Sequence, residues 1–259
     1  MTDTEKTIQV TILGSGTCVP SLRRSSCAVL IETAGQKLLV DAGAGTIHRL
    51  LEAGISIFDI SYIFFSHFHP DHTSELVPFL FATKYPDRHS RKIPLTLVAG
   101  KGFTSFLKGL YKAYGSWIKL NPGFLSIVEM DILKPDYLDC GFFTVDTRPA
   151  AHNPESISYR INAPSGYSVV YSGDTDYSKK LKALAASADI LICDCSHPDS
   201  LKVKGHLCPS LAGRIAADAK VRCLVLTHFY PECDRFDIEK ECRKTYNGRL
   251  VIAEDLMRL

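Results

Sequence analysis

The chain has 259 residues, of which 46% are hydrophobic and 22% are charged, as in ordinary soluble globular proteins. Its formal net charge of +2 neither demands nor excludes a polyanionic substrate, and no long basic run suggests a nucleic-acid arm. No apolar stretch approaches the roughly 20 residues that a membrane span needs, which argues against a membrane-spanning protein.

The N-terminal residues and the cysteines favour a cytoplasmic protein. Residues 1–6 are polar and acidic, unlike a secretory signal. The nine cysteines are an odd number scattered through apolar segments, which predicts reduced thiols rather than a disulfide framework. Cys193 and Cys195 lie in a strand pattern without a matching second pair, so no cysteine metal cluster is expected.

The first half of the chain alternates between apolar strands and short helices. Hydrophobic periodicity and turn residues predict strands at 8–13, 27–31, 37–40, 62–65 and 94–99, and helices at 47–53, 75–80 and 103–114. The glycine-rich turn at 41–46 lacks the lysine of a P-loop and the spacing of a dinucleotide fingerprint. We therefore expect Asp41 to brace the histidine loop that follows, rather than the turn to cradle a phosphate.

The loop behind the strand at 62–65 gathers histidine and aspartate: His67, His69, Asp71 and His72. Imidazole and carboxylate are ligands that a borderline-soft divalent metal prefers. In extended chain His67 and His69 point to one side and can share one ion. Asp71 and His72 lie where the chain turns into a helix, so they can serve a second ion. A polar loop with incidental histidines is the alternative, but one loop rarely gathers four such side chains.

The second half of the chain resembles the first, with antiparallel strands followed by strand–helix alternation. Strands are expected at 142–151, 158–162, 167–171, 189–194, 222–227 and 250–252, and helices at 177–186, 209–219 and 236–244. The chain has no repeats, low-complexity tracts or linkers, so we expect one domain over residues 1–259.

Residues at the ends of these strands complete two sets of metal ligands. His152, Asp174 and His228 each end an apolar strand, where open α/β folds place their sites. One set is His67, His69, His152 and Asp174, and the other is Asp71, His72, His228 and Asp174. The two oxygens of a carboxylate such as Asp174 can bridge ions about 3.5–4 Å apart. We expect three other histidines to be structural residues: His48, His89 and His197.

Several motifs together resemble a known family. They are His67-x-His69-x-Asp71-His72, Leu13-Gly14-Ser15-Gly16-Thr17, Asp41-x-Gly43-x-Gly45-Thr46, Ser172-Gly173-Asp174-Thr175, Gly205-His206 and Thr227-His228. This pattern resembles the metallo-β-lactamase superfamily and, within it, the ribonuclease Z-type branch of phosphodiesterases. The resemblance implies an αββα sandwich of two mixed sheets flanked by helices, with two metal ions on one edge. It also implies hydrolysis by a metal-bridging hydroxide, usually with zinc, although manganese and iron accept the same ligands.

The resemblance gives catalytic roles to two further residues. His206 matches the histidine of this branch that steadies the phosphate and protonates the leaving oxygen. Asp194 stands where the branch commonly has a glutamate oriented toward that histidine, so the shorter aspartate must reach further. An ordinary strand-end acid is the other reading of Asp194. Asp71 is also placed to accept a proton.

One departure from the branch bears on the substrate. Enzymes that process tRNA 3′ ends carry a long arm between the third-histidine motif and the bridging aspartate, where this chain has only a short hairpin at 153–173. We therefore rank a phosphodiesterase acting on a small or flexible phosphodiester, such as a cyclic nucleotide, first. A ribonuclease Z-like endoribonuclease acting on RNA 3′ ends ranks second, a thioester or lactone hydrolase third, and a non-catalytic metal-binding module last.

The segment 101–124 interleaves lysines with aromatic residues and has two readings. It could form a lid that stacks on and neutralises a nucleotide-like substrate, or replace the missing arm in RNA binding. It could equally be an amphipathic helix that packs within the fold or in a homodimer interface, with its lysines in water. We favour packing or the interface slightly.

Overall fold

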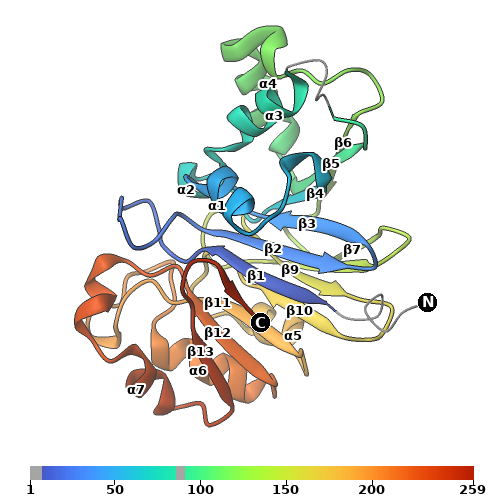
Figure 1. Ribbon diagram of the computed structural model, residues 1–259. Coiled ribbons are helices and arrows are strands. Elements are labelled where there is room, and N and C mark those ends of the chain that lie inside the picture. The colour runs from blue at the N-terminus through green and yellow to red at the C-terminus, as the bar shows by residue number, and fades with distance from the viewer. Residues whose placement is uncertain (1–7, 86–90) are drawn as a thin grey trace.

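The structure is a computed structural model that describes residues 8–85 and 91–259. Within this range the chain forms two seven-stranded sheets that lie face to face, with helices on both outer surfaces (Figure 1). The αββα sandwich of two mixed sheets expected from the resemblance is therefore confirmed. The predictions for residues 1–6 and for His89 lie outside the described residues.

The first sheet comes mainly from the N-terminal half. Its strand order is β14-β1-β2-β3-β4-β5-β6, with β1 at Gln9–Gly14, β2 at Ala28–Thr33, β3 at Gln36–Val40, β4 at Ile60–Phe65, β5 at Leu95–Gly100, β6 at Leu125–Met130 and β14 at Met257–Arg258. Four helices cover its outer face: α1 at Thr46–Glu52, α2 at Pro70–Thr73, α3 at Leu76–Lys84 and α4 at Phe103–Tyr114 (Figure 1).

The second sheet mirrors this plan. Its strand order is β13-β12-β11-β10-β9-β8-β7, with β7 at Asp136–Asp139, β8 at Thr144–Pro149, β9 at Ile157–Asn162, β10 at Ser168–Tyr171, β11 at Ile190–Asp194, β12 at Cys223–Thr227 and β13 at Arg249–Ile252. Its outer helices are α5 at Lys179–Leu184, α6 at Pro209–Asp218 and α7 at Ile238–Arg243. Short 3-10 turns occur at Ile57–Asp59, Gly115–Ile118, Asp199–Leu201 and Pro231–Arg235.

The first sheet is apolar on both faces because it is covered on both. Neighbouring residues of a strand point to opposite faces, so Phe64 joins the core between the sheets while Phe65 packs under the outer helices. Leu38 and Leu39 divide in the same way. This explains why the first-half strands read as continuous apolar runs rather than alternating ones.

The direction of the strands explains at which edge of the sheets the candidate site lies. Strands β3 to β6 run parallel in the first sheet, and β10 to β13 run parallel in the second. The carboxyl ends of parallel strands meet at one edge of a sheet, and loops at such edges are where α/β folds place their sites.

Three further findings concern predictions made above. Only the antiparallel pair β9–β10 occupies the interval where tRNA-processing enzymes carry an arm, as expected. All nine cysteines are free thiols. Within residues 8–85 and 91–259, no helix has the length and apolar character needed to cross a bilayer.

Candidate metal centre

The histidine loop is held between a buried strand and a short helix. Strand β4 ends at Phe65, and Pro70 begins α2, a position where proline's missing N–H costs no hydrogen bond. His67 and His69 lie in the extended stretch before the helix, whereas Asp71 and His72 lie in its single turn. This is the division between the two pairs that the sequence predicted.

Asp174 lies between the two predicted ligand sets and offers one oxygen to each. Its Oδ2 lies 3.7 Å from Nε2 of His67 and 3.9 Å from Nε2 of His152. Its Oδ1 lies 3.3 Å from Nε2 of His72 and 3.3 Å from Nε2 of His228. The carboxylate is buried, so this arrangement fits a bridge between two cations.

The remaining predicted ligands complete the same two sets. His69 joins His67, His152 and Asp174 in a group whose ligand atoms lie within 4.8 Å of one another, and Asp71, His72 and His228 form a second group. The Nε2 atoms of His67, His72 and His228 are buried and have no hydrogen-bond partner among the described residues. Buried polar atoms are rarely left unpaired, so these three nitrogens fit metal coordination.

Asp41 holds the histidine loop from behind, as the sequence predicted. Its Oδ2 accepts hydrogen bonds from Nδ1 of His72 at 2.7 Å, from the hydroxyl of Tyr171 at 2.7 Å and from that of Ser66 at 2.8 Å. The backbone N–H of Ser66 donates to its other oxygen at 2.8 Å. A carboxylate on the outer nitrogen of a ligating histidine fixes the orientation and tautomer of the ring.

Burial and neighbouring charges shift the pKa values of the candidate ligands strongly. Burial opposes protonation of His228, but the carboxylates of Asp174, Asp194 and Asp71 outweigh it and raise its pKa to about 10. Burial and the neighbouring imidazole of His72 lower the pKa of His67 to about 2. The proton on Nε2 of His228 must therefore leave before that nitrogen can bind a cation.

His206 and Asp194 form a hydrogen-bonded pair beside the ligands. Nδ1 of His206 lies 3.1 Å from Oδ2 of Asp194, so the aspartate does reach this histidine. Burial lowers the pKa of His206, but the hydrogen bond and charge of Asp194 outweigh it, and the net shift is upward. Asp194 also faces Nδ1 of His228 at 3.6 Å, a second contact that the sequence did not indicate.

His206 can also be grouped with Asp174 and His228 as a third ligand set. However, Nδ1 is the atom that lies 3.9 Å from Asp174, and Asp194 already engages it. This geometry favours proton transfer by His206 over metal ligation.

Comparison with known proteins agrees with this geometry. Residues 8–246 match the family described as anti-Pycsar protein Apyc1. The chain belongs to the Apyc1 family. It is 32% identical to the uncharacterized protein Rv1339 of Mycobacterium tuberculosis strain H37Rv, covering 93% of this chain and 88% of that protein. It is 26% identical to ribonuclease Z of Mycobacterium bovis strain BCG / Pasteur 1173P2, covering 97% and 98% of the two chains.

The fold of this Apyc1-family chain has a close counterpart among solved structures. The metallo-β-lactamase fold protein YhfI from Bacillus subtilis superposes with a TM-score of 0.82 at 23% identity, covering 97% of this chain and 98% of that one. The chain is thus a member of the metallo-β-lactamase superfamily, in its ribonuclease Z-like branch. It is a metal-dependent hydrolase, and its His/Asp clusters are compatible with the dinuclear site typical of the fold.

Close backbone approach at Gly43 supports the site in the Apyc1-family chain. A Cβ at this position would collide with the carbonyl oxygen of Asp71 and the Cβ of Ser26. We expect Gly43→Ala to destabilise the protein by about 1–3 kcal/mol and to weaken metal binding, because the Asp71 backbone must shift. Thermal unfolding and metal titration measure both effects.

The matched control is Gly109→Ala in α4, where a Cβ meets nothing within 4 Å. Because alanine is the better helix former, this change should leave stability unchanged or raise it by up to about 1 kcal/mol. Equal losses in the two variants would show that the approach at Gly43 has no special role.

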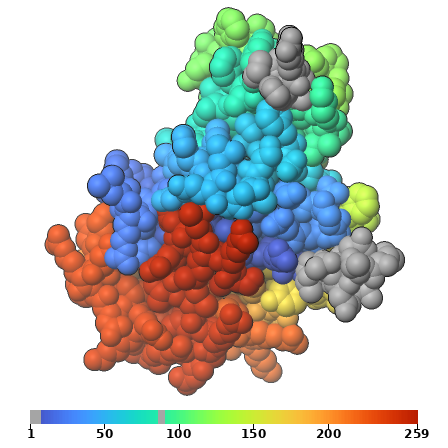
Figure 2. Space-filling view, viewed as in Figure 1, coloured from blue at the N-terminus to red at the C-terminus, as the bar shows by residue number. Residues whose placement is uncertain are grey.

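One part of segment 101–124 packs within the fold, and another part is exposed on the surface. Phe103 is buried against Phe65 and Phe68, and Phe106 stacks on Phe68 with ring centroids 5.2 Å apart. This part of α4 therefore packs behind the histidine loop. Trp117 is 60% exposed and lies beside Phe81. The segments of α3 and α4, teal to green, form the upper lobe of the molecule (Figure 2). The lysines of the segment are exposed: Lys101, Lys108, Lys112 and Lys119.

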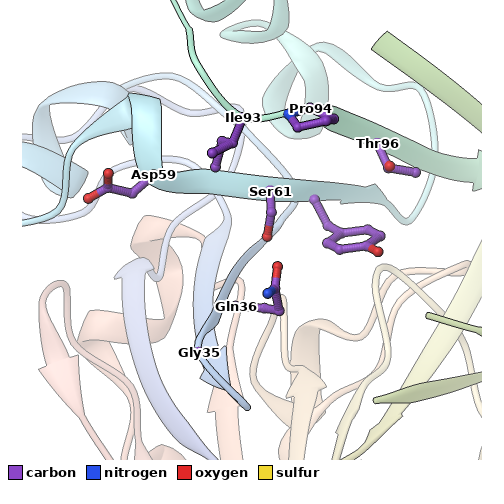
Figure 3. Close-up of a pocket in the computed structure, with 8 residues that line it drawn as sticks. Gly35, Gln36, Asp59, Ser61, Ile93, Pro94 and Thr96 are labelled. Carbon is purple, nitrogen blue, oxygen red and sulfur yellow. The ribbon is translucent and has the colours of Figure 1, made fainter. Parts of the chain in front are cut away.

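A separate hollow lies at the opposite end of the first sheet. Its volume is about 350 Å³, and it is lined by Gly35, Gln36, Asp59, Ser61, Tyr62, Ile93, Pro94 and Thr96. Figure 3 shows Ser61 and Gln36 pointing toward each other while Asp59 lies apart. With one carboxylate and no histidine or cysteine in its lining, this hollow does not rival the His/Asp centre.

Sequence reasoning missed several contacts that position the predicted residues. Nδ1 of His152 donates to the carbonyl of Gly205 at 3.0 Å, and the side chain of Asn153 touches His69. Among the histidines expected to be structural, His197 is stacked on Tyr230 with centroids 4.5 Å apart, whereas His48 is exposed on α1. Asn153 directly follows a predicted ligand, and this adjacency was the available signal.

Proposed function

We propose that the protein is a dinuclear phosphodiesterase that hydrolyses a small or flexible phosphodiester such as a cyclic nucleotide. The observation that carries this proposal is the placement of Asp174 with one oxygen toward each ligand set, beside the His206–Asp194 pair. When bound, two divalent cations supply a nucleophile at neutral pH and offset the charge of the phosphodiester.

The side chains of the protein bind the two cations and transfer protons. The ligands of the first site are His67, His69, His152 and Asp174, and those of the second are Asp71, His72, His228 and Asp174. His206 donates a proton to the leaving oxygen from Nε2, while Asp194 accepts its Nδ1–H and keeps the ring protonated. Burial would raise the pKa of Asp71, but His228 and His72 lower it to about 2, so Asp71 is ionised and able to accept a proton.

Hydrolysis of bis(p-nitrophenyl) phosphate by zinc-loaded protein, with precursor tRNA as competitor, tests the proposal. We expect turnover that EDTA abolishes and that micromolar RNA leaves unchanged. Suppression by low concentrations of RNA would instead support an endoribonuclease. Absence of turnover with zinc, manganese and iron would contradict a phosphodiester substrate and direct the assay to thioesters and lactones.

The endoribonuclease is kept as a second candidate because of the exposed lysines on segment 101–124 and the similarity to ribonuclease Z. If these lysines bind RNA, Lys108→Ala combined with Lys112→Ala should lower RNA affinity and reduce its salt dependence. The short β9–β10 hairpin favours the small substrate.

We also propose the identity of the metal, the oligomeric state, the cellular location and the domain organisation. Zinc is the expected metal because the ligands are mainly imidazole, and elemental analysis of the purified protein tests it.

A homodimer is proposed through the exposed face around Trp117, Tyr114 and Phe81, and the mass in solution tests it. A cytoplasmic location agrees with nine free thiols, and residues 1–259 are proposed to act as one domain.

A further inference from the structure

A histidine that binds a cation through one ring nitrogen usually donates the N–H of the other to an acceptor, which fixes the tautomer and the ring orientation. The candidate centre shows this for ligands that turn Nε2 inward. Nδ1 of His72 meets Asp41 at 2.7 Å, and Nδ1 of His152 meets the carbonyl of Gly205 at 3.0 Å.

His69 is turned the other way. Its Nδ1 faces inward, 3.4 Å from Nε2 of His152, and its Nε2 faces outward, 2.7 Å from Nδ2 of Asn153, which places the amide nitrogen as the donor in this contact. The outer partner of His69 is therefore an uncharged amide rather than a carboxylate or a backbone carbonyl.

The backbone holds Asn153 firmly in this place. Its N–H donates to the hydroxyl of Ser156 at 3.1 Å, and its carbonyl accepts from the N–H of Ser156 at 3.0 Å. The turn directly follows His152, so one short segment supplies both a ligand and the partner of a second ligand.

The chemistry of the amide sets its orientation. When Nδ1 of His69 gives its lone pair to a cation, Nε2 carries the proton and needs an acceptor. Only Oδ1 of Asn153 can accept it, since the amide nitrogen is a donor. A half-turn of the amide exchanges its oxygen and nitrogen within the same space. Without a cation, the same amide can donate to Nε2 while Nδ1–H of His69 faces His152.

We infer that Asn153 is a positioning residue for the cation of the His67–His69–His152 site, accepting the Nε2–H of His69 through Oδ1. The inference rests on the proposed metal centre and adds to it a residue that supports one of the two sites. Outer partners of this kind typically change metal affinity by about 10- to 100-fold.

The test is zinc affinity, measured by competition with a chromophoric chelator, for three variants and the wild-type protein. Asn153→Leu keeps the approximate size but removes the acceptor, and we expect one of the two bound ions to be held about 10- to 100-fold more weakly. Asn153→Asp restores an acceptor and should hold both ions at least as tightly as wild type. Asn247→Leu alters an exposed asparagine and should change neither affinity.

Weakening of one ion, with rescue by aspartate and unchanged thermal unfolding of the metal-free protein, would support the inference, because a merely structural role predicts no such rescue. Equal weakening of both ions, wild-type affinity in Asn153→Leu, or failure of Asn153→Asp to rescue would overturn it. If the wild-type protein bound no zinc, manganese or iron, the metal centre itself would be refuted. The two failures are thus distinguishable.

Discussion

Replacing Asp174 with alanine is expected to remove both cations and to lower kcat/KM by about 10⁴-fold or more, toward the level of the metal-free protein. The reason is that its two oxygens face different ligand sets, at 3.3 Å from His72 and 3.7 Å from His67. No other carboxylate among the described residues joins both sets as Asp174 does. Elemental analysis and turnover measure the two losses independently.

The matched control for this variant is Asp218→Ala. Asp218 lies at the end of α6 in an exposed ion pair with Lys182 at 3.4 Å, and such pairs contribute little to stability. This variant should keep its metal content and its activity. An Asp174→Ala protein with wild-type turnover would contradict the bridging role.

Replacing His206 with alanine is expected to slow cleavage of a cyclic nucleotide roughly 10²- to 10⁴-fold while leaving metal content unchanged. The loss should be much smaller for bis(p-nitrophenyl) phosphate. A ribose oxygen leaves as a poor, basic anion that needs a proton, whereas p-nitrophenolate leaves without one. Comparing kcat for the two substrates therefore separates proton donation from metal binding.

The pH dependence of activity gives a second test of His206 as the general acid. A general acid must be protonated, so activity with the cyclic nucleotide should fall as pH rises through the pKa of His206. Asp194 moves that pKa upward against the effect of burial, which extends the active range toward higher pH. This alkaline limb should disappear in His206→Ala, while His48→Ala on the exposed face of α1 should retain it. Loss of metal from His206→Ala would instead make His206 a ligand.

The sequence predicted β4, β10 and β12 because each ends as a buried apolar run followed at once by a polar turn. Strand β8, which precedes His152, instead alternates between buried and half-buried residues and was predicted from that alternation. The sequence missed β7, with the sequence DYLD, and β14, with only two residues, because edge strands this short and polar have no clear periodicity. It also missed β6, a half-exposed edge strand directly after segment 101–124. None of these strands carries a predicted site residue.

The candidate ligands could be named from the sequence because their residue types and strand-end positions are local features. Their outer contacts could not, because these join distant parts of the chain. Asn153 reaches His69 across 84 positions, and Tyr171 reaches Asp41 across 130. Asp194 was assigned to His206 by resemblance, but its position between His206 and His228 depends on how β11 lies beside β12.

The distribution of the ligands along the chain has a consequence for how the protein acquires its metal during synthesis. A ribosome releases the cluster of residues 67–72 long before His228, and Asp174 emerges between them. The complete set exists only after the second sheet has docked on the first. Because such a site is not preformed in the unfolded chain, tight binding of two ions at the proposed centre would be coupled to the last stage of folding. We therefore expect completely folded molecules to retain metal and partly synthesised ones to lose it.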